Sequence, residues 1–111
     1  MTIDNETWII AAGDMIIRKR IDCGRGALSL LERLIYCLWV ADYSMRNAGD
    51  LATACDLHES FHEEASQLSK VLKLPVTQSA FGLSPADFEQ QYFRRFDGIC
   101  DEVRAAHTGH E

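Results

Sequence analysis

Five consecutive residues, His58-Glu59-Ser60-Phe61-His62, match the pattern H-E-x-x-H. On a helix, two histidines four positions apart lie on one face and can chelate a single zinc ion. The glutamate between them can then act as the general base on a zinc-bound water. The segment therefore offers one catalytic hypothesis, a small zinc-dependent hydrolase with His58 and His62 as metal ligands and Glu59 as the base.

This hypothesis needs a third protein ligand, because a catalytic zinc site has three. No downstream pattern marks that ligand, for which Glu89, His107 and His110 are the candidates. Two more carboxylates follow the segment at once, in a place where zinc proteases usually have an uncharged wall. The competing interpretation is that these residues lie on a solvated or partner-facing helix. We favour it, and with it a protein that is not an enzyme and holds no cofactor.

Acidic residues are concentrated in the same part of the chain. The net charge is −6, and no Lys or Arg occurs between Arg46 and Lys70. Direct nucleic-acid binding is disfavoured, because it depends on an excess of basic side chains. A row of carboxylates on a helix could instead dock a basic protein, such as a DNA-binding protein. We predict that this row is Asp56, Glu59, Glu63 and Glu64.

Two other interpretations of the acidic row stay open. It could be a solvated helix face, since many acidic proteins carry such faces for solubility. The chain could also be a structural domain with no dedicated ligand. In either case the four carboxylates would have no partner.

Apolar periodicity predicts an all-α protein, a compact four-helix bundle-like single domain. The segment 27–48 is apolar around most of its girth, so we expect it to be the central helix, ended by Gly49. Ser84, Pro85 and Asp87 form a helix start, with a capping side chain, a proline at the first position and a favourable carboxylate. We expect a loop over residues 75–83 and helices over residues 4–22, 27–48, 50–73 and 84–106.

The remaining expectations concern location and assembly. No stretch approaches the ~20 apolar residues that span a bilayer. The four cysteines have no paired spacing, so we expect reduced thiols and a cytoplasmic protein. Helices whose apolar faces stay partly uncovered form dimers readily. A homodimer could therefore use three aromatic side chains as anchors, Trp8, Trp39 and Tyr43.

A resemblance to a known family rests on the segment around residues 26–56. The matching positions are Leu28, Ser29, Glu32, Arg33, Tyr36, Asn47 and Gly49. In this pattern the chain resembles a family of small helical bacterial proteins, mostly of unknown function, that includes a DNA mimic. The resemblance implies a dimer that presents carboxylates in place of DNA phosphates to a repressor.

Overall fold

The computed structural model describes residues 3–109, which contain helices and no strand. The predicted all-α single domain is confirmed, but this part of the chain has six α-helices in place of four. They are α1 (Asn5–Cys23), α2 (Leu30–Ala48), α3 (Ala52–Leu57), α4 (Phe61–Val71), α5 (Pro75–Phe81) and α6 (Pro85–Gly109), with a short 3₁₀ turn at Arg25–Ala27. Within residues 3–109, none of these helices is long and apolar enough to cross a membrane.

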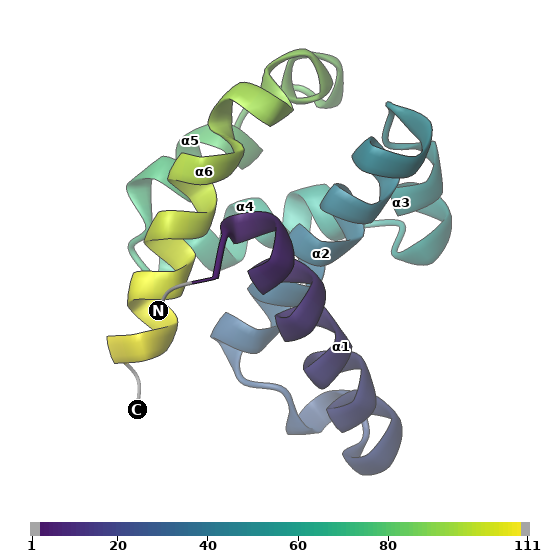
Figure 1. The fold of residues 1–111 in the computed structure, drawn as a ribbon, viewed down its shortest axis with the longest axis vertical. Helices are drawn as coiled ribbons and strands as arrows, with labels where there is room; N and C mark the ends of the chain where they lie inside the picture. The colour runs from purple at the N-terminus through teal and green to yellow at the C-terminus, as the bar shows by residue number, and fades with distance from the viewer. Residues whose placement is uncertain (1–2, 110–111) are drawn as a thin grey trace.

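Helix α2 is central, as its composition predicts. Helices α1, α3, α4 and α6 all pack against it (Figure 1). Its buried side chains, among them Ile35, Leu38 and Val40, point in different directions around the helix. Ser29 and Glu32 form a capping box at its start, and Gly49 ends it in the left-handed conformation, with φ 75°.

The single helix expected over residues 50–73 is wrong, because the segment forms two helices. His58 adopts an extended backbone conformation (φ −157°, ψ 94°), which ends α3 after Leu57. Helix α4 begins only at Phe61. The H-E-x-x-H segment therefore runs across a break, and its two histidines do not share a helix.

The loop expected over residues 75–83 is also wrong, because most of it is helix α5. Pro75 takes the first helical position, where its missing N–H leaves no donor unpaired. The Glu102 carboxylate then accepts the backbone N–H groups of Val76 (3.0 Å) and Thr77 (2.8 Å). Glu102 lies on α6, so the cap of α5 comes from a distant part of the chain.

A buried polar contact joins α2 to α6. The Asp42 carboxylate is 2% exposed and accepts hydrogen bonds from the Tyr92 hydroxyl (2.6 Å) and the Arg46 guanidinium (2.9 Å). Burial and the neighbouring Asp42 charge raise the pKa of Tyr92 well above its usual range. The phenol therefore stays protonated and keeps donating to Asp42, which fixes α6 against the central helix.

Candidate functional site

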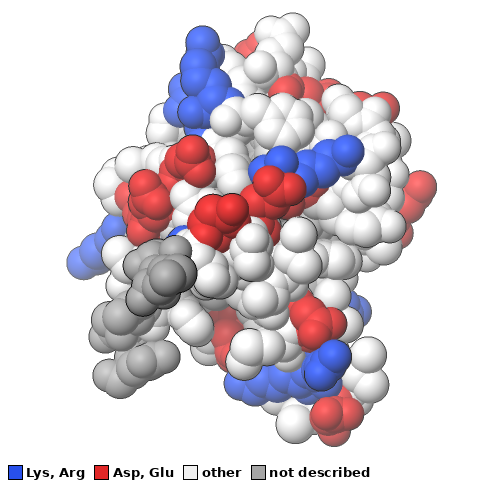
Figure 2. All heavy atoms as spheres, viewed as in Figure 1, with Lys and Arg blue, Asp and Glu red and all other residues white. Residues whose placement is uncertain are grey.

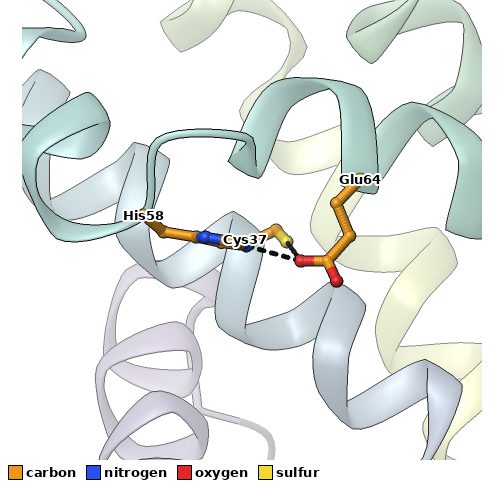
Figure 3. Close-up of side chains that lie close together, drawn as sticks. All are labelled: Cys37, His58 and Glu64. Carbon is orange, nitrogen blue, oxygen red and sulfur yellow. Dashed lines mark hydrogen bonds and ion pairs between the residues drawn. The ribbon is translucent and has the colours of Figure 1, made fainter.

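Three side chains from separate elements converge beside α2. Cys37 lies on α2, His58 in the connection between α3 and α4, and Glu64 in the first turn of α4 (Figure 3). The Cys37 thiol donates to Glu64 Oε2 at 3.2 Å, and His58 Nε2 lies 2.6 Å from the same oxygen. The break after Leu57 makes this possible, because it leaves His58 beside the start of α4.

Arg33 completes the cluster from one turn earlier on α2. Its guanidinium forms an ion pair with the other carboxylate oxygen of Glu64, Oε1. The Glu64 side chain is 14% exposed and that of Arg33 is 37% exposed, so the ion pair balances the Glu64 charge in a partly buried position. The Tyr36 ring packs near His58, with 6.0 Å between the ring centroids, and closes one side of the cluster.

The pKa of Glu64 reports how strongly these groups favour the carboxylate. Burial by itself raises that pKa. Hydrogen bonds from His58, Arg33 and Cys37, together with the Arg33 charge, outweigh it and lower the pKa of Glu64 from 4.5 to about 2. Glu64 is therefore ionised at every pH near neutrality.

The cluster combines three kinds of metal-ligand atom. The Cys37 sulfur, a His58 ring nitrogen and a Glu64 carboxylate oxygen all lie within 4.8 Å of one another. Thiolate, imidazole and carboxylate are the ligands that zinc takes in proteins. A cavity of about 10 Å³ lies alongside, and it is lined by Arg20, Leu28, Arg33, Tyr36 and Glu64.

The structure does not assemble the zinc site predicted from the H-E-x-x-H segment. His62 Nε2 bonds the carbonyl oxygen of Leu83 at 2.8 Å, whereas His58 Nε2 is directed at Glu64. The His62 ring is also enclosed by the rings of Phe61, Phe81 and Phe88. His62 is therefore part of the packing between α4 and its neighbours. Glu59, in contrast, is exposed to solvent.

The candidate third ligands are also separated from the segment's two histidines. The Glu89 carboxylate accepts the backbone N–H of Leu51 at 3.0 Å, so it serves the start of α3. His107 is exposed near the C-terminal end of α6. His110 lies outside the described residues.

Of the four carboxylates in the predicted row, three are exposed and one is not. Asp56, Glu59 and Glu63 are exposed along the end of α3, the connection and the first turn of α4. Glu64 points inward to Arg33 and does not belong to this exposed set. On the face drawn in Figure 2, acidic and basic side chains are interspersed, with acidic atoms also at the margin where α3 lies.

Sequence reasoning named His58 and Glu64 for other roles and missed their partners. In the sequence, Arg33 stands out only as part of the family pattern, and Cys37 only as one of four cysteines without paired spacing. Their spacing of one helical turn does place them on one side of α2. The sequence of α2 by itself does not indicate that His58 and Glu64 contact that side of the helix.

Comparisons with family models, curated proteins and solved structures found no match to this chain. The resemblance to the family that includes a DNA mimic therefore stays a prediction.

The lowered pKa of Glu64 leads to a prediction about how stable the folded protein is in acid. A carboxylate with a folded-state pKa of about 2 and an unfolded value of 4.5 stabilises the fold above pH 4.5, and this stability is lost as the pH falls toward 2. The unfolding free energy of the wild-type protein should therefore fall with pH by an amount of the order of 3 kcal/mol that comes from Glu64. We expect this part of the fall to be absent in Glu64→Gln. Urea unfolding measured between neutral pH and about pH 2 tests it.

Glu63→Gln is the matched control, because Glu63 is the neighbouring carboxylate but is exposed. It should keep the wild-type dependence of unfolding free energy on pH. Equal pH dependence in the wild-type protein and in Glu64→Gln would contradict the assignment.

Proposed function

We propose that this is a non-enzymatic interaction protein that binds the basic surface of another protein. The observation that carries the proposal is the set of exposed carboxylates of Asp56, Glu59 and Glu63, which we call the acidic surface. The chain around it contains no Lys or Arg from residue 47 to residue 69. The partner would present clustered Lys and Arg side chains, as a DNA-binding protein does where it meets phosphates.

The internal pairing of Glu64 supports this proposal. Arg33 of α2 reaches α4, and its charge is balanced by Glu64. The three outer carboxylates are therefore not offset by that arginine. Their attraction for a basic surface would act mainly on association and would weaken with salt, because exposed charges are screened over about 10 Å at 0.1 M.

The same geometry weakens the hydrolase alternative. A zinc hydrolase built on the segment needs His58 and His62 to face one ion. Their Nε2 atoms are engaged instead with Glu64 and with the Leu83 carbonyl. An exposed Glu59 then remains as part of the acidic surface.

Reversing the charges of the acidic surface should weaken binding to a basic probe. We expect the variant D56K/E59K/E63K to lose at least about tenfold in affinity for a labelled Lys- and Arg-rich peptide, since attraction becomes repulsion. Fluorescence anisotropy at low and at physiological salt measures the loss. Glu64 is left unchanged because its replacement would disturb the interior.

The control reverses three other exposed carboxylates, in the variant D22K/D87K/D101K, so that the net charge changes by the same amount. This control should keep most of the affinity. If both variants lose affinity equally, only net charge matters and the acidic surface has no special role.

A second proposal, that two copies associate through α1, is favoured by one observation. The outer side of α1 carries three isoleucines, Ile10, Ile17 and Ile21, at spacings of seven and four residues, so they lie on one side of the helix. Ile10 is 55% exposed and Ile21 is 76% exposed. A groove of about 430 Å³ follows this side, and Trp39 of α2 forms part of its wall.

Trp39 extends the apolar surface from α1 onto α2. Its ring stacks with that of Tyr43 at 5.4 Å between centroids, and Tyr43 is exposed. A Cβ atom at Gly13 would lie 2.2 Å from the Trp39 ring, so glycine is what allows α1 to lie directly on it. This arrangement supports Trp39 and Tyr43 as anchors, whereas Trp8 packs against the core.

The charges of α1 favour an antiparallel second copy. Asp4 and Glu6 lie at its N-terminal end, and Arg18 lies near its C-terminal end. Arg18 is exposed and pairs only weakly with Asp14 of its own helix, at 3.3 Å. In an antiparallel pair, Arg18 of each copy would approach the acidic start of the other.

Ile10→Arg should disrupt this association. It would place an unpaired charge in the apolar interface, so we expect the dimer dissociation constant to rise by about 100-fold or more. Sedimentation velocity over a range of concentrations measures it. Val71→Arg, at an exposed apolar position on α4, should leave the distribution unchanged; a wild-type protein that is monomeric throughout would contradict the proposal.

A further inference from the structure

We propose that Cys37, His58 and Glu64 form a zinc-binding site, distinct from the H-E-x-x-H site and independent of the proposed partner binding. The three ligand atoms come from α2, from the connection after α3 and from α4. They point toward one another and lie within 4.8 Å (Figure 3). One ion would thus tie together three elements that the chain otherwise holds by hydrogen bonds.

Two of the distances between ligand atoms can be compared with those that a zinc ion needs. Ligand atoms around a tetrahedral zinc lie roughly 3.5 Å apart, given bonds of about 2.0 to 2.3 Å. The Cys37 sulfur and Glu64 Oε2 are already 3.2 Å apart. His58 Nε2, at 2.6 Å from Oε2, would have to move outward by about 1 Å.

The groups around the cluster suit a metal site. Arg33 bonds the Glu64 oxygen that does not face Cys37 and His58, so it can orient the carboxylate as an outer partner of a metal ligand does. The adjacent cavity of about 10 Å³ has room for about one water molecule. Three protein ligands leave one position of a tetrahedral zinc open to a water molecule. Of the three ligands, only Glu64 lines the adjacent cavity.

Binding would exchange protons for the ion. The Cys37 thiol must lose its proton to become a thiolate ligand, and His58 must offer the lone pair of Nε2 with its proton on Nδ1. Glu64 is already ionised near neutrality because its pKa is about 2. At least one proton is therefore released per ion, and affinity should rise about tenfold per pH unit while the free thiol is protonated.

The test uses the full chain without a tag, prepared free of metal and of chelator. Native mass spectrometry after addition of zinc chloride should show one ion per chain. Cobalt chloride should give the charge-transfer absorption that marks a thiolate bound to Co²⁺. Zinc affinity measured by competition with a chromophoric chelator at several pH values should show the predicted proton release.

Variants identify the ligands. Cys37→Ser should abolish the charge-transfer absorption, and Cys37→Ser and His58→Gln should each weaken zinc binding by more than about 100-fold. Cys55→Ser and His107→Gln are matched controls at exposed positions and should bind as the wild-type protein does. Circular dichroism of each metal-free variant shows whether the fold is intact.

Three results would overturn the proposal. The first is a wild-type protein that is folded and takes up no zinc in the competition assay. The second is a Co²⁺ complex without the thiolate absorption. The third is loss of binding in Cys55→Ser or His107→Gln, because the ion would then be held by exposed side chains. If Cys37→Ser does not fold, His58→Gln and the wild-type spectrum still decide the question.

Discussion

The structure depends on the contacts of one largely buried carboxylate, that of Glu64, which lies between α2 and α4. Glu64 accepts hydrogen bonds from the Cys37 thiol and from His58, and an arginine on α2 balances its charge. Removing a charge from water costs several kcal/mol, so such a group is stable only when it is paired. The position of α4 and the extended conformation of His58 are therefore linked to one side chain.

The same contact divides the acidic residues of this region into two sets. Glu64 is directed inward, and its charge is balanced there. Asp56, Glu59 and Glu63 are directed outward and keep their charges at the surface. Adjacent positions in the sequence, such as Glu63 and Glu64, thus have different surroundings and different chemistry. A proposed binding surface and a proposed metal site can lie side by side because of this division.

Helix boundaries set by local signals could be predicted from the sequence. The left-handed glycine at the end of α2 is present, and Ser84 accepts the N–H of Asp87 at the start of α6. Boundaries set by remote side chains could not be predicted. Helix α5 is capped by Glu102, and α3 begins where Glu89 accepts the N–H of Leu51.

The site was predictable to a smaller extent than the fold. The sequence places His58 and Glu64 six residues apart, and a continuous helix would have put them on different faces. Their meeting depends on the break after Leu57, and their partners Arg33 and Cys37 lie more than twenty residues earlier. Helical periodicity carries no information about such a contact, because it describes one element at a time.

A double-mutant cycle on Arg33 and Glu64 tests the central claim most directly. Unfolding free energies are measured by urea denaturation for the wild-type protein, Arg33→Met, Glu64→Gln and the double variant. If the ion pair holds α4 against α2, the two single losses should exceed the loss in the double variant by about 1 to 3 kcal/mol. Strictly additive losses would show that the two side chains stabilise the fold independently, and would contradict the account.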